Sequence, residues 1–406
     1  MKERYLSSLI QAFCFSNHKM ALVSGPRQAG KTTLAKMLLE PRQAGNYYNW
    51  DQHEFRKLWT KNPDATLPSE SSTTPLVVYD EIHKARGWKK TLKGIYDTLK
   101  IPTDILVTGS ARLNVYKKRG DSLLGRYFHF RLHPFTLHEM TSSKCGAPEP
   151  LMEALFQKSS SEKKEDIKNF EALFQYGGFP EPLFLQDEKR ARLWRTSRLE
   201  KVIREDLRDL SRIPELSRIE MLASLLPDKV GSPFSVVSVR EDLEVSHPTV
   251  VRWLNGLKEL YYLFEVKPYH RRIVRTLKKE GKIYLWDWTE VDEPAARFEN
   301  LVACHLLKAC HYWTDSGEGS FELYYLRDKE KHEIDFLITR DSQPWLPVEV
   351  KLSETEPSPH WKKFLPQLKC KKGVQIVKTP GHFRLHEVSE SQVLVVSASY
   401  FLSHWI

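Results

Sequence analysis

Residues 24 to 36 contain the side chains and spacing of a phosphate-binding loop, in the order SGPRQAGKTTLAK. Gly25 is followed, after four residues, by Gly30, Lys31 and Thr32, which matches G-x-x-x-x-G-K-[ST] in every specified position. Glycines let backbone N–H groups point at phosphate oxygens, and the helix that follows adds the positive end of its dipole. We therefore predict that Lys31 contacts the β- and γ-phosphates of ATP and that the Thr32 hydroxyl binds Mg²⁺. A glycine-containing turn without function is the alternative. The predicted nucleotide-binding residues are Gly25, Pro26, Arg27, Gln28, Ala29, Gly30, Lys31, Thr32 and Thr33.

In a second segment, PLVVYDEIHK at 75 to 84, an apolar run is followed directly by the two acidic residues Asp80 and Glu81. Its pattern is typical of a buried central strand. Asp80 suits the Walker B role of binding Mg²⁺, and Glu81 can polarise the attacking water as a catalytic residue. A third apolar segment ends in Thr108 and Ser110, whose hydroxyls we assign to sensing the γ-phosphate.

The elements around these residues predict an α/β fold of the P-loop NTPase type. Residues 19 to 25 are a short apolar run, 31 to 39 repeat apolar side chains at helical spacing, and 104 to 110 form a further strand. The order strand, loop, helix, acidic strand and polar-tipped strand indicates a parallel sheet flanked by helices. Ligands of such sheets bind at the carboxyl ends of the strands.

The composition favours a modular protein with polyanionic partners. A chain of 406 residues is long enough for several domains, and its formal net charge of +10 favours nucleic acid over acidic proteins. We expect a cytoplasmic protein without a membrane partner, because no stretch approaches about 20 apolar residues and the amino terminus lacks a signal-peptide pattern.

The five cysteines indicate neither a disulfide framework nor a zinc ribbon, because they are scattered and include no CxxC pair. The repeated pairs Cys304-His305 and Cys310-His311 lie six residues apart. On a helix this spacing is a rotation of about 240°, so the two pairs cannot bind one metal from one face.

Charge and turn patterns divide the chain into four predicted regions. These are an ATPase core at 1 to 140, a helical lid at 141 to 212, a winged helix-turn-helix at 213 to 286 and an α/β domain at 287 to 406. In the lid, residues 190 to 213 read as one amphipathic helix with an apolar face formed by Leu193, Ile203, Leu207 and Leu210.

The third region reads as a helix-turn-helix followed by a basic hairpin. The break VSHPT separates two helical segments, and Ser246 or His247 suits a helix start because proline at 248 is tolerated in the first turn. The following segment interleaves cations with tyrosines, as a wing that touches DNA would, although a solvated hairpin or a subunit contact is the alternative. The candidate DNA contacts are Arg271, Arg272, Arg275, Lys278 and Lys279.

The last region contains a second group of charged residues with the spacing of a catalytic site. We predict a helix over 297 to 307 with Glu299 in its first turn, paired strands over 321 to 328 and 332 to 340, and a strand over 344 to 352. Asp335 lies on the second strand, and Glu349 and Lys351 project from one face of the third. Asp335 and Glu349 can bind Mg²⁺, and Lys351 can orient a water molecule. Glu299 can complete the coordination shell of the metal or of the water. A structural set of alternating charges is the alternative.

Taken together, the chain resembles prokaryotic AAA-type (AAA+) ATP-binding proteins with a winged helix and a PD-(D/E)XK nuclease-like domain. The resemblance rests on GPRQAGKTT, VVYDEIHK, LVTGSAR, LLGRYFHFRLHPFTLHEM, YGGFPEP, FENLVA, EIDFLI and VEVK. It implies a homo-oligomer, with a ring as one form, in which an arginine of one subunit completes a neighbour's site. Arg126 is our first candidate and Arg112 the second; an arginine in trans neutralises charge on the γ-phosphate.

Three functions fit these features. The first is an ATP-driven motor or remodeller of DNA, with branched or junction DNA as a candidate substrate. The second is an ATP-regulated nuclease of genome maintenance or defence. The third is a switch in which ATP binding controls assembly with a partner.

Overall fold

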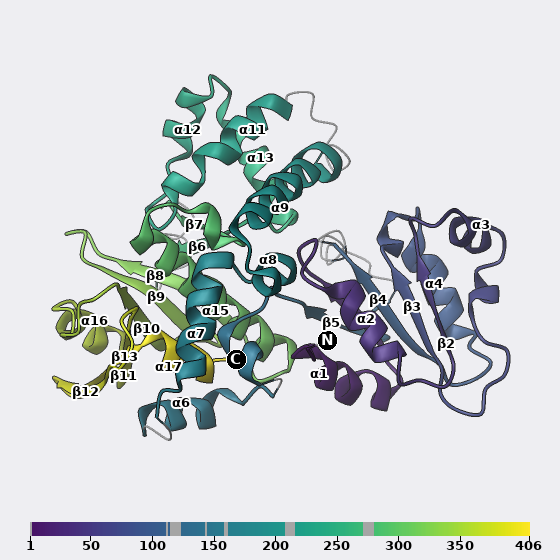
Figure 1. The fold of residues 1–406 in the computed structure, drawn as a ribbon, viewed down its shortest axis with the longest axis horizontal. Helices are drawn as coiled ribbons and strands as arrows, with labels where there is room; N and C mark the ends of the chain where they lie inside the picture. Colours follow the sequence, from purple (N-terminus) through teal and green to yellow (C-terminus); the bar gives the residue numbers. More distant parts are fainter. Residues whose placement is uncertain are drawn as a thin grey trace. The chain divides into compact units, whose positions relative to one another are not determined.

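The structure is a computed structural model whose chain divides into two compact units, Met1–Pro134 and Phe135–Ile406 (Figure 1). It describes residues 2–110, 113, 123–142, 144–157, 161–207, 216–270 and 280–406. The boundaries predicted at residues 140, 212 and 286 stay predictions.

The first unit contains a five-stranded sheet in the order β2-β3-β4-β1-β5, in which every neighbouring pair is parallel. Its strands are β1 (Met20–Ser24), β2 (Gly45–Asn49), β3 (Leu76–Asp80), β4 (Asp104–Gly109) and β5 (Tyr127–Arg131). The three strands predicted from sequence are confirmed. The sequence analysis did not predict β2, which lacks an apolar run, or β5.

Helices pack against the strands of this sheet. They are α1 (Leu6–Phe13), α2 (Lys31–Leu39), α3 (His53–Lys61) and α4 (Trp88–Asp97). Helix α2, which follows the loop after β1, contacts the neighbouring strands β3 and β4 of this sheet. Buried side chains of α3 and α4, including Trp59 and Leu92, pack with Leu22, Val77 and Val107 of the sheet.

The second unit begins with helices α5 (Leu137–Thr141), α6 (Pro148–Phe156), α7 (Lys164–Tyr176), α8 (Pro180–Leu185) and α9 (Glu188–Glu200). The prediction of one regular helix over 190 to 213 is wrong, because α9 gives way to a π-helical segment, Lys201–Leu207. Leu193 is 70 % exposed, since the buried stripe of α9 is Ala191, Trp194 and Arg198. Ile203 and Leu207 are buried as predicted, and Leu210 lies outside the described residues.

Three helices and a strand pair follow: α11 (Leu216–Leu225), α12 (Val236–Asp242), α13 (His247–Glu259), β6 (Leu263–Pro268) and β7 (Lys282–Leu285). Helix α13 begins where the sequence predicted, because the Ser246 side chain caps it by accepting a hydrogen bond from the Thr249 N–H. Strands β6 and β7 pair antiparallel.

Strands β6 and β7 form one edge of an eight-stranded sheet in the order β12-β13-β11-β10-β9-β8-β6-β7. The remaining elements are α15 (Pro294–Asp315), β8 (Phe321–Arg327), β9 (Glu333–Arg340), β10 (Gln343–Lys351), α16 (Trp361–Leu368), β11 (Lys372–Val377), β12 (Phe383–Val388), β13 (Ser391–Ser397) and α17 (Ala398–His404). The predicted pairing of 321 to 328 with 332 to 340 is confirmed. The helix predicted to end at 307 continues to Asp315, because Ala309, Cys310 and Trp313 keep its buried face apolar.

Candidate nucleotide-binding site and a second charged site

The loop between β1 and α2 has the backbone that phosphate binding requires. A side chain at position 25 would collide with the backbone, since an added Cβ lies 2.2 Å from the Leu132 carbonyl oxygen. Gly30 has a φ of 96°, a left-handed conformation that glycine adopts without strain. These two glycines let the chain turn from the end of the strand into the first turn of the helix.

Lys31 is buried at the mouth of this loop, with 6 % of its surface exposed. Its Nζ donates hydrogen bonds to the carbonyl oxygens of Gly25 at 2.9 Å and Pro26 at 2.7 Å. The ammonium is therefore held where the chain curls, and phosphate oxygens can replace these two carbonyls when a nucleotide binds.

Asp80 is the centre of a hydroxyl network at the carboxyl ends of the strands. Its carboxylate accepts hydrogen bonds from Thr32 Oγ1 at 2.8 Å, Tyr47 Oη at 2.6 Å and Thr108 Oγ1 at 2.5 Å. Carboxylate and hydroxyl oxygens are the ligands that Mg²⁺ prefers, so Thr32 and Asp80 fit the metal role predicted for them. Thr108 contacts Asp80 in this arrangement.

Tyr47 is a site residue that the sequence analysis missed. It lies on β2, whose exposed and half-buried pattern gives no strand signal. Burial and the Asp80 carboxylate raise the pKa of its hydroxyl to about 12, so it remains a hydrogen-bond donor at neutral pH.

Glu81 follows β3 in a conformation that is uncommon for a residue with a side chain. Its φ is 58°, and its backbone N–H donates to the Thr108 carbonyl oxygen at 2.9 Å. Burial raises the pKa of its carboxyl, although the charge of Lys31 opposes the shift. A carboxylate with a raised pKa is a better base, which suits the predicted polarisation of water.

His83 links the two predicted catalytic segments. Its Nε2 lies 3.2 Å from Ser110 Oγ and 3.5 Å from Glu81 Oε2. Its ring covers the end of β4, because a Cβ added at Gly109 would lie 2.4 Å from His83 Nδ1. The sequence shows this histidine two residues after Glu81 but not that it contacts Ser110.

Arg4 braces the nucleotide loop from a distant part of the sequence. It is 2 % exposed and donates hydrogen bonds to the carbonyl oxygens of Ala29 at 2.5 Å and His133 at 2.6 Å. The loop is therefore tied to the chain segment that follows β5.

Arg126 lies at the opposite end of the sheet from the loop of its own chain. Its carbonyl oxygen accepts from the Met20 N–H at the start of β1, whereas the loop follows the end of that strand. Its guanidinium pairs with Asp97, with Nε to Oδ1 at 2.6 Å and Nη2 to Oδ2 at 2.9 Å. Arg126 therefore cannot contact a nucleotide bound by the same chain. Arg112, the second candidate, lies outside the described residues.

The second unit brings together the charged residues predicted on its strands. The Val350 N–H donates to Asp335 Oδ2 at 2.8 Å, the Asp335 N–H donates to Glu349 Oε2 at 3.3 Å, and Lys351 Nζ lies 3.0 Å from Glu349 Oε1. Burial, together with the charge of Asp335, raises the pKa of Glu349 to about 8. Burial likewise raises the pKa of Glu299 to about 7, and Asp335 adds to that shift.

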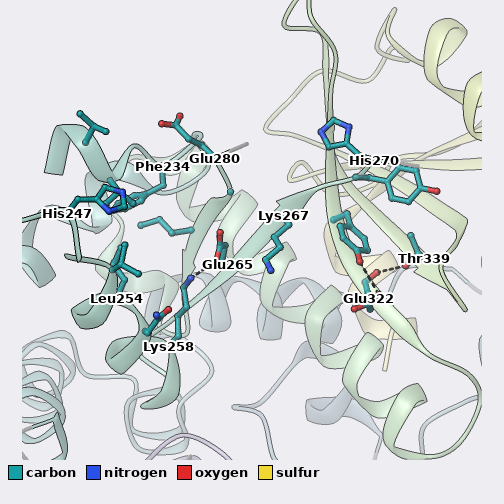
Figure 2. Close-up of a pocket in the computed structure, with 18 of the residues that line it drawn as sticks. Phe234, His247, Leu254, Lys258, Glu265, Lys267, His270, Glu280, Glu322 and Thr339 are labelled. Carbon is teal, nitrogen blue, oxygen red and sulfur yellow. Dashed lines mark hydrogen bonds and ion pairs between the residues drawn. The ribbon is translucent and has the colours of Figure 1, made fainter. Parts of the chain in front are cut away.

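The predicted DNA contacts Arg271, Arg272, Arg275, Lys278 and Lys279 all lie outside the described residues. A cavity of about 860 Å³ lies between α13 and the sheet, and its lining includes described residues on both sides of this segment, His270 and Glu280 (Figure 2). Lys267 and His247 line its wall, together with the ion pair of Glu265 and Lys258. Glu322 lies on the wall opposite this pair, beside Thr339. The described lining thus mixes both signs of charge.

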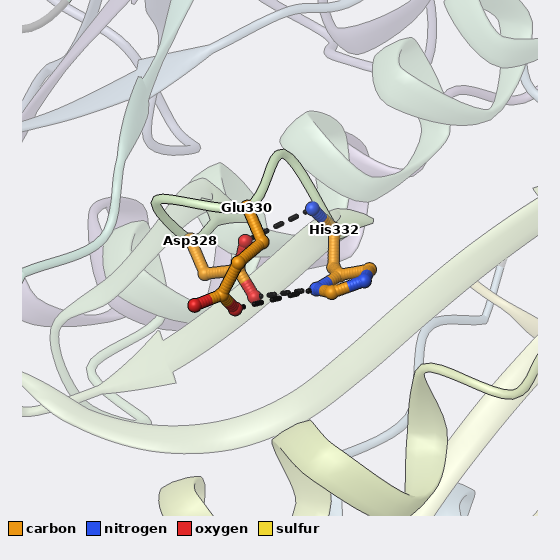
Figure 3. Close-up of side chains that lie close together, drawn as sticks. All are labelled: Asp328, Glu330 and His332. Carbon is orange, nitrogen blue, oxygen red and sulfur yellow. Dashed lines mark hydrogen bonds and ion pairs between the residues drawn. The ribbon is translucent and has the colours of Figure 1, made fainter.

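Asp328, Glu330 and His332 form the one group among the described residues that brings three metal-ligating atoms within 4.8 Å of one another (Figure 3). Lys363 already neutralises this group, with its Nζ 2.5 Å from Asp328 Oδ2 and in contact with Glu330. We therefore assign it to surface ion pairing.

Comparison with known proteins finds a match for most of the first unit. Residues 17–141 match a family model described as an AAA domain, which supports an AAA-type ATPase. Residues 167–289 and 295–400 match two models described as domains of unknown function (DUF8612 and DUF4143). No helix among the described residues is long and apolar enough to cross a bilayer.

Relatives in three organisms are themselves uncharacterized proteins. One from Haemophilus influenzae is 23 % identical over 377 residues, covering 86 % of each chain. One from Mycobacterium tuberculosis is 23 % identical, covering 83 % of this chain and 71 % of the relative. One from Methanocaldococcus jannaschii is 21 % identical, covering 83 % and 76 %.

Two solved structures are similar in part. A Walker-type ATPase of Pyrococcus abyssi is 16 % identical, with a TM-score of 0.45 over 73 % of this chain and 96 % of that one. AMPPCP-bound DnaA from Aquifex aeolicus is 14 % identical, with a TM-score of 0.31 over 63 % and 86 %. At these TM-scores the likenesses say nothing about the function of this chain.

Proposed function

We propose that this protein is an ATP-hydrolysing remodeller that acts on DNA, with branched or junction DNA as a candidate substrate. The observation that carries the catalytic part is the convergence of Thr32, Thr108 and Tyr47 on Asp80 beside the Lys31 loop. These groups come from one helix and three neighbouring strands, so the fold holds them in place before a nucleotide binds.

Each residue has a separate task in hydrolysis. Lys31 exchanges its two carbonyl partners for phosphate oxygens. Thr32 and Asp80 would hold Mg²⁺, whose charge would offset that of the β- and γ-phosphates. Glu81 orients and polarises the water that attacks the γ-phosphate. Thr108 and Ser110, at the end of β4, sense the γ-phosphate through their contacts to Asp80 and His83.

DNA binding is proposed from the second unit. Helices α11, α12 and α13 followed by the β6–β7 hairpin have the element order of a winged helix, and five of the cations predicted to contact DNA lie between these strands. Clustered cations are what phosphate contacts require, and the net charge of +10 agrees with a polyanionic partner.

Oligomer formation is proposed from the position of Arg126. This side chain lies at the end of the sheet that faces away from its own loop, so a role in ATP hydrolysis requires the site of another subunit. The bidentate pair with Asp97 holds the guanidinium in place until a neighbouring subunit offers a phosphate.

The test is steady-state Mg²⁺-ATP hydrolysis with no DNA, duplex, single strand and a four-way junction, at low and physiological salt. We expect stimulation that ranks the DNA forms and weakens as salt rises. The double variant Arg271→Gln/Arg272→Gln should reduce the slope of log affinity for duplex DNA against log salt concentration by the amount expected for roughly two phosphate contacts. Its matched control, Lys189→Gln/Arg190→Gln on exposed positions of α9, should leave stimulation unchanged. Hydrolysis indifferent to every DNA refutes the proposal and favours a nucleotide-controlled assembly switch.

An ATP-regulated nuclease is the second candidate, supported by the contacts that link Asp335, Glu349 and Lys351 but opposed by the buried lysine described in the next subsection. It predicts DNA cleavage that Asp335→Ala abolishes while ATP hydrolysis remains. Cleavage that this variant leaves unchanged points to a contaminating enzyme.

A further inference from the structure

Lys282 is a buried cation inside the second charged site, although the sequence pattern counted it among the cations of the basic hairpin. It lies on β7 and is 1 % exposed. Its Nζ is 2.5 Å from Glu333 Oε1 and 3.1 Å from Glu299 Oε1. The same Glu299 oxygen accepts a hydrogen bond from the Tyr284 hydroxyl at 2.6 Å.

The ammonium of Lys282 also acts on the carboxylate of Asp335. Among the charges near Asp335, that of Lys282 is the strongest influence lowering its pKa, against a larger rise caused by burial. The negative charges of Glu299, Asp335 and Glu333 in turn raise the pKa of Lys282, although burial opposes the rise, so it stays protonated. One ammonium thus interacts with Glu299 and Asp335, two of the three carboxylates that were assigned to the metal site.

The carboxyl groups of this site already face several cationic side chains of the protein itself. Four carboxyl groups meet three cationic side chains: Glu299, Glu333, Asp335 and Glu349 against Lys282, Arg327 and Lys351. The protein's own ammonium and guanidinium groups therefore offset most of the negative charge that would attract a divalent cation.

One oxygen of Glu299 is already occupied by the protein. Oε1 accepts hydrogen bonds from Lys282 Nζ at 3.1 Å and from the Tyr284 hydroxyl at 2.6 Å. Among the described residues, Glu299, Asp335 and Glu349 do not bring three ligand atoms within 4.8 Å of one another. With Lys282 in place, these residues therefore do not fit the divalent cation that the nuclease-like pattern implies.

We infer that Lys282 is the resident cation of the site formed by Glu299, Asp335 and Glu349, standing in the position assigned to a divalent metal. The site then joins β7, α15, β9 and β10 through ion pairs. It binds no Mg²⁺ or Mn²⁺ and does not cut DNA by a metal-activated water. This inference is independent of the ATPase proposal, which uses only residues of the first unit.

The experiment is a Mn²⁺ titration of the full chain, followed by electron paramagnetic resonance, without nucleotide and in an Asp80→Asn background that removes the metal ligand of the ATPase site. We expect no bound Mn²⁺ in this background and one Mn²⁺ per chain when Lys282→Met is added. Adding Asp335→Asn to that variant should abolish the new site. The control Lys258→Met, which removes a lysine from its ion pair with Glu265, should create none.

Two outcomes overturn the inference. One is Mn²⁺ binding by the Asp80→Asn protein that Asp335→Asn abolishes, because the ammonium would then not hold the position. The other is a folded Lys282→Met variant that gains no site. If Lys282→Met does not fold, the comparison of Asp80→Asn with and without Asp335→Asn decides alone: equal absence of Mn²⁺ supports the inference.

Discussion

Replacing Lys31 with alanine is the sharpest test of the nucleotide site. In the nucleotide-free chain this ammonium already makes two charge-assisted hydrogen bonds, to Gly25 and Pro26, so it is positioned before ATP arrives. Loss of one preorganised donor to the transition state costs about 2.7–4 kcal/mol, which is a fall of about 10²- to 10³-fold in kcat.

The same substitution has a smaller cost in stability. Alanine leaves the two carbonyl oxygens without their donor, which lowers the free energy of unfolding by about 1–3 kcal/mol. For a unit of the size of Met1–Pro134 this is a fall in Tm of several degrees. Hydrolysis must therefore be measured well below the melting transition, with circular dichroism as the check on folding.

Lys90→Ala is the matched control, because Lys90 lies on α4 of the same unit with an exposed side chain. Coupled-enzyme ATPase assays should show near-normal turnover for this control. If folded Lys31→Ala protein hydrolyses ATP at the normal rate, the assignment of the site is wrong.

Three further predictions follow from particular contacts. His83→Ala should lower kcat about tenfold with little change in KM for ATP, because His83 positions Glu81 without touching nucleotide; a rise in KM alone contradicts this role. Arg126→Ala should abolish the part of the specific ATPase activity that rises with protein concentration, whereas Asp97→Ala should retain it. If both variants have the same effect in a concentration series, the ion pair of Arg126 with Asp97 is only structural. The raised pKa of Glu349 means that the native state binds more protons than the unfolded state between about pH 4.5 and 8, so stability is highest below this range and falls as pH rises through it. Glu349→Gln should flatten this part of the urea-denaturation profile, and an unchanged slope rules out Glu349 as its source.

Local motifs allowed the nucleotide site to be predicted from sequence. The phosphate loop depends on residues that are contiguous from 25 to 33, and its function comes largely from backbone N–H groups and one lysine. The strand ending at Asp80 was predictable for a related reason, since four consecutive apolar residues are typical of a strand buried on both faces.

Long-range contacts account for what the sequence left out. Arg4 contacts residues 25 and 129 positions away, and Tyr47 reaches Asp80 from a strand without an apolar run. Such partners have no fixed spacing, because the order of parallel strands places them side by side.

In the second unit, too, some features could be predicted from the sequence and others depended on the tertiary structure. Its strands and the placement of Glu349 and Lys351 on one face follow from the two-residue period of a strand. That Lys282 lies among those carboxylates depends on the pairing of β6 with β7 and β8, which joins segments far apart in sequence. The sequence by itself determined which side chains could do chemistry, and the tertiary structure decided which charges they meet.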